Sequence, residues 1–258
     1  MALAEIRFFG NSIGCSTTMN VILPDGGKGP FPAFYLLGGL SDDHSKWARF
    51  TSIERYVTGV PLIVVMPNGG RGWYTNSHAV PQQAYEDHLI KDVVGYVDQI
   101  FPTITGRKGR AIGGLSMGGY GAVKLAMKYP TMFCSATSHS GAVLTPMHKP
   151  ESRPKEFSPV LEECKAIFGP KFRGGPNDLH ALARKCVRSR QRPALRLDCG
   201  TGDFLLEQNR AFTAFLKSIR YTHDYAEFPG AHEWSYWDTQ VQEALAFHRK
   251  YLEIAVYQ

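Results

Sequence analysis

The chain has 258 residues, of which 43% are hydrophobic and 20% are charged, which is close to the average of soluble globular proteins and excludes disorder as a description of the whole chain. The length predicts a single domain, residues 1–258, because one core commonly extends to about 250 residues before a chain divides. The net charge of +6 and the basic segment 184–192 suggest binding to a nucleic acid, but no aromatic platform or binding motif accompanies them. We therefore expect a solvated helix face there and no nucleic-acid partner.

The compartment is predicted from the N-terminus and the cysteines. Glu5 and Arg7 interrupt the apolar stretch that a signal peptide requires, and the longest apolar run, 60–66, is too short to span a bilayer. The five cysteines are odd in number and include no CxxC pair, which favours reduced thiols. We expect a cytoplasmic protein with no membrane partner.

The first third of the chain predicts short strands bounded by turn residues, at 5–9, 18–24 and 32–39, arranged as a meander at a sheet edge. From residue 44 onward, helical and strand patterns alternate. Helices are predicted at 44–57, 83–101, 117–129, 206–220 and 235–251, and strands at 61–67, 110–115, 133–138, 194–199 and 223–228. This alternation predicts an α/β fold with a mostly parallel, eight-stranded sheet and helices on both faces.

Residues 144–192 interrupt the alternation after the sixth predicted strand. The segment carries six prolines around two short helical patterns. We expect a cap-like insertion within the single domain, of the kind that forms a lid over a site.

A Gly-x-Ser-x-Gly motif, 114–118, directly follows an apolar strand and directly opens a helical pattern. This is the context of a nucleophile elbow, which needs glycines because the serine sits in a strained turn that neighbouring backbone approaches closely. The start of the helix directs free N–H groups at the site and favours an oxyanion. We predict Ser116 as the nucleophile of acyl transfer; the alternative is an ordinary glycine-rich turn, while a phosphate-binding loop is disfavoured by the glycine spacing.

The serine needs a base, and nine histidines compete for that role. In α/β-hydrolases the order along the chain is serine, acid, histidine, each in a loop at the carboxyl end of a strand. Five histidines are set aside by position: His139 follows the serine too closely, His148 and His180 fall within the insertion, His223 begins a strand and His248 lies within a helix. His232 lies between a strand and the last helix and is predicted as the base, with a capping or stacked histidine as the alternative.

The acid is expected after the preceding strand, where the segment 195–204 offers Asp198 and Asp203. Asp198 lies within the strand pattern, whereas Asp203 follows two glycines in the loop and is predicted to orient the imidazole. An N-cap role is the alternative for Asp203, and Glu207 is a more distant candidate for the acid.

The developing oxyanion needs two backbone donors. We predict the N–H of Met117, directly after the nucleophile, and that of Leu40, in the turn after the third strand, with Gly39 as the next choice. Aromatic residues cluster in the neighbouring loops. We predict that Gly39, Trp73 and Trp234 contact the substrate, although core packing is the more common role of a tryptophan.

A resemblance to a known family covers nearly the whole chain and rests on five long segments that occur in the same order as in that family. They are FYLLGGLSDDHSKW, VVMPNGGRGWYTN, GGLSMGGYGAVKLAMKYP, LDCGTGDFLLEQNRAF and EFPGAHEWSYWDTQVQEALAF. The chain resembles the esterase family of α/β-hydrolases that includes esterase D, tributyrin esterases, feruloyl and acetyl-xylan esterases and the antigen 85 mycolyltransferases. The resemblance implies Ser116, Asp203 and His232 as the catalytic triad, hydrolysis of short-chain esters without a cofactor, and an association into homo-oligomers that is frequent among relatives.

Two positions depart from the pattern of the family. Relatives usually have His-Gly where this chain has Gly38-Gly39, and S-formylglutathione hydrolases have His where this chain has Leu115. A dedicated glutathione thioesterase is therefore less expected.

Together these features predict a serine carboxylesterase that acts on small-molecule esters through a covalent acyl-enzyme, with no metal or other cofactor. Acyl transfer to a sugar or lipid alcohol, and hydrolysis of feruloyl or acetyl-sugar esters, use the same triad and stay open. A catalytically inactive hydrolase fold that serves as a binding module is the alternative from another class.

Overall fold

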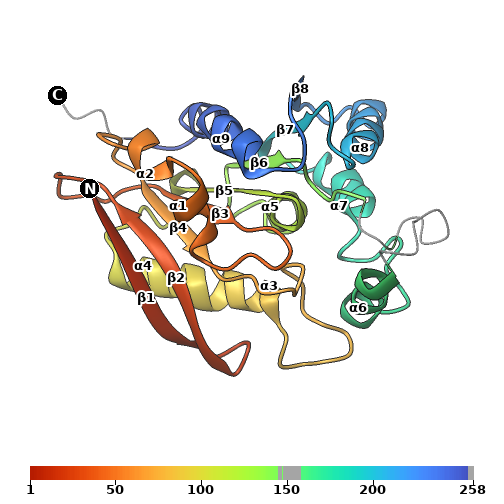
Figure 1. Ribbon diagram of the computed structural model, residues 1–258, viewed down its shortest axis with the longest axis horizontal. Helices are drawn as coiled ribbons and strands as arrows, with labels where there is room; N and C mark the ends of the chain where they lie inside the picture. Colours follow the sequence, from red (N-terminus) through yellow and green to blue (C-terminus); the bar gives the residue numbers. More distant parts are fainter. Residues whose placement is uncertain (145–146, 148–157, 255–258) are drawn as a thin grey trace.

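The structure, a computed structural model, describes residues 1–144, 147 and 158–254 (Figure 1). Its described strands form one sheet of eight in the order β1-β2-β4-β3-β5-β6-β7-β8. The strands are β1 Ala2–Gly10, β2 Cys15–Leu23, β3 Ala33–Leu37, β4 Ile63–Pro67, β5 Arg110–Leu115, β6 Ser135–His139, β7 Ala194–Gly200 and β8 Asp224–Phe228. Pairing from β4 through β3 to β8 is parallel, so the predicted mostly parallel, eight-stranded α/β sheet is confirmed.

The edge of the sheet differs from the predicted meander. β1 and β2 form an antiparallel hairpin, but β2 pairs next with β4, not with β3. β3 lies between β4 and β5, and all five of its residues are buried. A strand covered on both faces belongs in the middle of a sheet, which is why the meander prediction was wrong.

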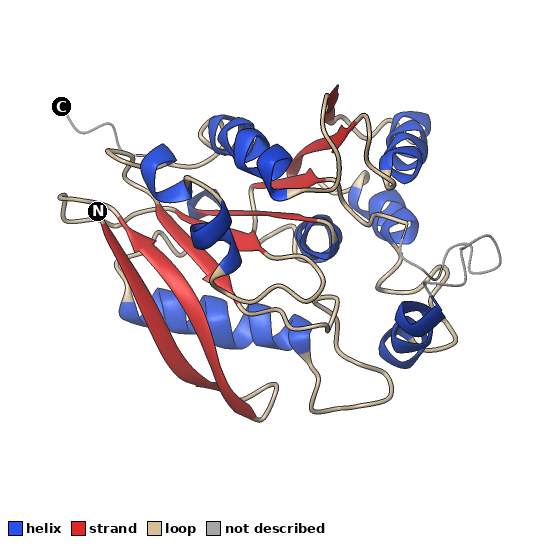
Figure 2. Ribbon diagram, viewed as in Figure 1, coloured by secondary structure: helices blue, strands red, loops and turns tan. Residues whose placement is uncertain are grey.

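Helices cover both faces of the sheet, as predicted (Figure 2). The described helices are α1 Lys46–Phe50, α2 Ile53–Tyr56, α3 Tyr85–Asp87, a π-helix His88–Val93, α4 Val94–Ile100, a 3₁₀ turn Arg107–Gly109, α5 Met117–Lys128, α6 Ser158–Phe168, α7 Leu179–Cys186, α8 Leu206–Ser218 and α9 Trp234–His248. In the described part of the chain, no helix combines the length and the apolar character needed to cross a bilayer.

Two predicted helices are interrupted in the structure. The helix expected at 44–57 is split between α1 and α2, because Thr51 is extended and the Ser52 amide donates to the Asp238 carboxylate instead of continuing a helix. The helix expected at 83–101 contains the π-helical segment between α3 and α4. The spacing of apolar side chains indicates which face of a helix is buried, but it does not show where a helix is interrupted or changes to a π-helix.

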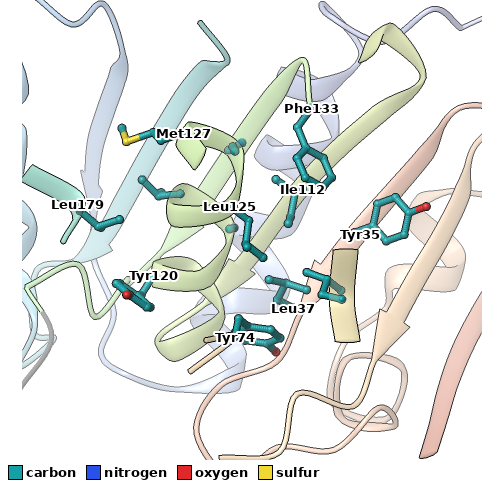
Figure 3. Close-up of a cluster of buried hydrophobic side chains, with 14 of the residues drawn as sticks. Tyr35, Leu37, Tyr74, Ile112, Tyr120, Leu125, Met127, Phe133 and Leu179 are labelled. Carbon is teal, nitrogen blue, oxygen red and sulfur yellow. The ribbon is translucent and has the colours of Figure 1, made fainter. Parts of the chain in front are cut away.

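A hydrophobic core lies on each face of the sheet because strand residues alternate between the two sides. Along β3, Tyr35 and Leu37 join the core under α4, α5, α7 and α8, whereas Phe34 and Leu36 join the core under α1, α2 and α9. Figure 3 shows the first of these cores, with Leu125 of α5 near the side chains of the central strands.

The order of the strands determines where a site can form. After β3 the chain turns to one side to form β4, and it then crosses over to form β5 on the other side of β3. The loops that leave the carboxyl ends of β3 and β5 therefore lead to opposite sides, and such a reversal of strand order is where open α/β sheets bind ligands. Residues 38–40 and Ser116 follow these two strands.

The segment predicted as a cap-like insertion, 144–192, contains α6 and α7. α7 packs against α5 and α8 and buries Leu179 and Ala183 in the main core. α6 is tied to a neighbouring loop, since the amides of His78 and Ala79 donate to carbonyls at its last turn. A cap-like role for 144–192 stays a prediction, because 145–146 and 148–157 lie outside the described residues.

A buried ion pair fixes the loop that follows β4. Lys124 of α5 is fully buried, and its ammonium group donates to Glu86 and Thr75 at 2.8 Å and to the Tyr74 carbonyl. Burial opposes ionisation of Glu86, but the Lys124 ammonium and further donors outweigh it and lower the pKa of Glu86 to about 2. Burial lowers the pKa of Lys124 to about 8.

The depressed pKa of Glu86 predicts a loss of stability in acid. Its contribution is complete above the unfolded-state pKa near 4.5 and is lost as the pH falls towards the folded-state value near 2. We expect wild type to lose about 2 kcal/mol more than Glu86→Gln between pH 6 and pH 3, measured by urea unfolding. Glu243→Gln, at an exposed position, serves as the control and should follow wild type. An equal loss in wild type and Glu86→Gln would contradict this assignment.

Candidate active site

Ser116 lies at a sharp turn between the end of β5 and the start of α5. Its backbone has φ 52° and ψ −117°, a conformation that L-residues rarely adopt. A Cβ atom at Gly114 would lie 2.6 Å from the Leu37 carbonyl oxygen, and one at Gly118 would lie 2.5 Å from the Gly38 carbonyl oxygen. The strained turn and the close backbone approach predicted for the motif are both present, and they hold the Ser116 side chain at the carboxyl edge of the sheet.

Three side chains from distant parts of the sequence meet at this edge. His232 Nε2 lies 3.1 Å from Ser116 Oγ, and His232 Nδ1 lies 2.8 Å from Asp203 Oδ2. Asp203 and His232 come from the loops after β7 and β8. This network assigns the Nδ1 proton to the bond with Asp203 and leaves Nε2 to accept the proton of the Ser116 hydroxyl. The arrangement can activate a hydroxyl group as a nucleophile.

Asp203 is held as a carboxylate. Burial opposes its ionisation, but hydrogen bonds from His232 and from the Leu205 amide outweigh burial and lower the pKa of Asp203 below its usual value. The Leu205 amide donates to Asp203 Oδ1 at 2.7 Å, so each carboxylate oxygen has its own donor. Asp203 thus combines the turn-capping contact that was its alternative role with the contact to His232.

The other candidate acid and several other histidines are engaged elsewhere. Asp198 is buried and bonds to His139 Nδ1 at 2.8 Å and to the Tyr236 hydroxyl at 3.0 Å, and not to His232. His248 faces two hydroxyl groups of β6, and burial together with His139 lowers its pKa to about 3. His223 contacts the Tyr221 carbonyl. His148 lies outside the described residues.

The turn after β3 lies beside the serine. Leu37 pairs with Gly114 in the sheet, and a Cβ atom at Gly39 would lie 3.5 Å from the Ser116 Cβ. The Gly39 amide already donates to the Asp42 carboxylate at 2.7 Å. Of the two amides that the sequence suggested in this turn, Leu40 is therefore the better placed to serve a ligand.

Asp42 is a residue of the site that sequence reasoning missed. Burial raises the pKa of this carboxyl group, and the hydrogen bond from Gly39 opposes the rise. The loop after β4 also holds the turn after β3 in place, since the Tyr74 hydroxyl donates to the Gly38 carbonyl at 3.0 Å. The only signal in the sequence was an aspartate three residues after the second glycine of the turn.

The two tryptophans predicted to bind substrate have different surroundings. Trp73 is only 3% exposed and packs edge-on against Tyr120 and Phe168. Trp234 is partly exposed, stacks on Phe50 and meets Trp47 edge-on. Among the ring contacts of the described residues, neither tryptophan touches the His232 ring.

Two other aromatic rings do contact His232. Phe204, which is 63% exposed, lies with its ring centroid 4.6 Å from the imidazole, and Trp237 meets the imidazole edge-on at 4.9 Å. Phe204 was missed, although it directly follows Asp203 in the sequence. An exposed apolar ring at this position offers a contact surface for an apolar group of a ligand.

Across residues 1–144, 147 and 158–254, no group of three or more His, Cys, Asp or Glu side chains is arranged to hold a metal ion. None of the five cysteines forms a disulfide, and four of them are buried.

Comparisons with known proteins agree on one family. Residues 10–248 match a family model named Esterase and described as "Putative esterase". An acetyl esterase of Caldicellulosiruptor saccharolyticus is 26% identical over 266 residues, covering 97% of this chain and 99% of that protein.

Two solved structures from Staphylococcus aureus are also similar over almost their full length. The substrate-bound fluorophosphonate-binding serine hydrolase F is 32% identical with a TM-score of 0.85, covering 96% of this chain and 98% of that one. The apoenzyme of an S-formylglutathione hydrolase is 28% identical with a TM-score of 0.82, with the same two coverages.

Proposed function

Since the chain belongs to the esterase family of carboxylic ester hydrolases, we propose that it is a serine carboxylesterase that cleaves short-chain esters through a covalent acyl-enzyme. The observation that supports this proposal most is the continuous hydrogen-bonded chain from Ser116 through His232 to Asp203. In this proposal Ser116 is the nucleophile, His232 the base and Asp203 the acid that orients it.

The proposed reaction has two halves. Ser116 Oγ attacks the ester carbonyl while His232 Nε2 takes the hydroxyl proton, and the amides of Leu40 and Met117 stabilise the resulting oxyanion. Collapse of this intermediate breaks the bond to the alcohol, which leaves with the proton from His232. Water then attacks the acyl-serine, giving its proton to His232, and the acid is released as that proton returns to Ser116.

Substrate contacts are proposed for Gly39, Trp73 and Trp234, as the sequence predicts, and for Phe204. Gly39 and Phe204 have the stronger support, because they lie against Ser116 and His232 respectively. Trp73 and Trp234 pack on other aromatic rings, and their proposed contacts rest on the sequence pattern alone.

Acyl transfer to an alcohol in place of water is the second candidate, because it differs only in the group that enters the second half-reaction. Hydrolysis of an acetylated sugar is a third, supported by the similarity to an acetyl esterase. The thioester S-formylglutathione also needs testing in view of the structural likeness to an S-formylglutathione hydrolase, although Leu115 departs from that group.

A panel of substrates tests the proposal and separates these candidates. It comprises p-nitrophenyl esters from acetyl to octanoyl, methyl ferulate, acetylated xylan and S-formylglutathione, with product analysis in the presence of added alcohol. We expect the highest kcat/KM on acetyl to butyryl esters and free acid as the main product. Absence of turnover on every ester would refute the proposed activity, and a transesterified product would favour acyl transfer.

The proposed role of Leu40 predicts a large effect of Gly39→Ala. The added Cβ would lie 2.7 Å from Leu115 Cδ1 and 3.0 Å from Asp42 Oδ2, so either the buried Leu115 side chain or the turn that carries the Leu40 amide has to shift. A misplacement of about 1 Å costs about 10²-fold in rate, and we expect a loss of this size in kcat on p-nitrophenyl butyrate. Gly106→Ala is the matched control, because no atom lies within 4 Å of its added Cβ. Full activity of Gly39→Ala would contradict the expected displacement of the Leu40 amide.

A cytoplasmic location belongs to the same proposal. Five cysteines that form no disulfide suit a reducing compartment. Association into a homo-oligomer stays a prediction from the resemblance.

A further inference from the structure

A hollow of about 660 Å³ lies at the amino-terminal ends of the strands, at the opposite edge of the sheet from Ser116. Its walls include Cys134, which directly precedes β6, together with Ala194 and Asp224, which begin β7 and β8. The 3₁₀ turn before β5 and the segment after α9 complete it. Ser116 follows the other end of β5, whose six residues span about 20 Å. The hollow, called here the amino-edge hollow, is therefore separate from the candidate active site.

Basic side chains dominate the charge of the amino-edge hollow. Five basic residues line it, namely Arg107, Lys108, Arg190, Arg192 and Lys250, against two acidic residues, Asp224 and Glu253. Among the described residues, none of the five forms an ion pair with a carboxylate. Their charges are thus available to a ligand.

Part of the basic segment 184–192 contributes to this wall. The sequence predicted a solvated helix face for the whole segment, but α7 ends at Cys186. Arg190 and Arg192 lie beyond the helix and line the hollow. The chain therefore turns two of these charges towards a concave surface.

Arg107 is held in place without being neutralised. Its guanidinium group donates to the Pro130 carbonyl at 2.9 Å and to the Arg192 carbonyl at 2.8 Å. These acceptors carry no formal charge, so the guanidinium keeps its full positive charge while its position is fixed. Such a preorganised cation is a better anion ligand than a freely rotating one, because less side-chain entropy is lost on binding.

Two further side chains add polar and aromatic surface. His223 lines the hollow, its Nδ1 faces the Tyr221 carbonyl at 2.7 Å, and its Nε2 has no partner within the described part of the chain. Tyr251, also in the wall, is 42% exposed and packs on Phe247 with ring centroids 5.1 Å apart. An exposed ring beside several cations can stack on a planar group that carries phosphates.

We propose that the amino-edge hollow binds a small molecule that carries two or more phosphate groups. The number of cations exceeds what one monovalent anion needs, and the volume suits a small ligand, not a polymer. This proposal is independent of the esterase function.

Isothermal titration calorimetry in 150 mM NaCl tests it with pyrophosphate and with ADP as probes. The test variant Arg190→Gln/Lys250→Gln removes two exposed cations from the wall. The matched control Lys185→Gln/Arg188→Gln removes the same charge from exposed positions outside the hollow. We expect wild type to bind pyrophosphate and the test variant to bind it at least about 10-fold more weakly, since the loss of one charged hydrogen bond costs about 10-fold in affinity. The affinity of the control should stay within about twofold of wild type. Both variants should keep wild-type activity on p-nitrophenyl butyrate.

Two outcomes would overturn the proposal. One is an absence of pyrophosphate and ADP binding at millimolar concentration, and the other is an equal weakening in both variants, which indicates general surface attraction. The two probes also distinguish the source of the phosphates. Tighter binding of ADP that is lost in Tyr251→Ser indicates a nucleotide, whereas equal affinities indicate that phosphate alone is recognised.

Discussion

Ser116→Ala is expected to lower kcat/KM for p-nitrophenyl butyrate by at least ~10⁴-fold, because removal of the nucleophile of a triad typically costs that much or more. The alanine methyl cannot form the acyl-enzyme, and His232 then has no hydroxyl to deprotonate. The variant should fold normally, since the strained turn around residue 116 depends on the glycines and not on the hydroxyl group. Initial rates and the melting temperature are measured on the same preparation.

The control for this variant is Ser235→Ala, an exposed serine just after His232, which should retain wild-type activity. His232→Ala should match Ser116→Ala, and the double variant should lose little more, because the two residues act as one unit. More than about a hundredth of wild-type turnover in Ser116→Ala would contradict the proposed mechanism.

Asp203→Asn is expected to lower kcat by about 10⁴-fold with a much smaller change in KM. An asparagine amide can donate to His232 Nδ1, which favours the tautomer with the proton on Nε2. That tautomer cannot accept the proton of Ser116, although the side chains keep their positions. Steady-state kinetics on p-nitrophenyl butyrate separates the loss in kcat from any change in KM.

Glu207→Gln is the matched control for Asp203. Glu207 was the more distant candidate for the acid, and in the structure it is 80% exposed and pairs with Arg210. We expect wild-type kinetics for this variant. A large loss in Glu207→Gln, together with an active Asp203→Asn, would transfer the role of the acid to Glu207.

Much of the fold was predictable because helical and strand periods are local. The strand predicted at 110–115 coincides with β5, and the helix predicted from Met117 begins there. The neighbours of each strand are not local information. The continuous apolar run of β3, AFYLL, is typical of a strand buried on both faces, but it does not say which strands flank it, and so the edge of the sheet was predicted wrongly.

The candidate site was predictable where position along the chain carries information. Asp203 and His232 were chosen because they lie in loops after successive strands, and the fold brings both loops to the edge that carries Ser116. Contacts that depend on tertiary packing were missed. The pairing of Lys124 with Glu86 joins residues 38 positions apart, and neither residue type suggests burial.

Covalent labelling by a fluorophosphonate probe tests the central claim most directly, because the probe reacts with a serine only when a neighbouring base activates it. Wild-type protein is treated with the probe, its intact mass is measured, and the modified residue is identified by peptide mapping. The proposed triad predicts one label per chain, on Ser116, and almost none in His232→Ala. Failure to label Ser116 under conditions that inactivate a known serine esterase, or labelling that persists unchanged in His232→Ala, would contradict it.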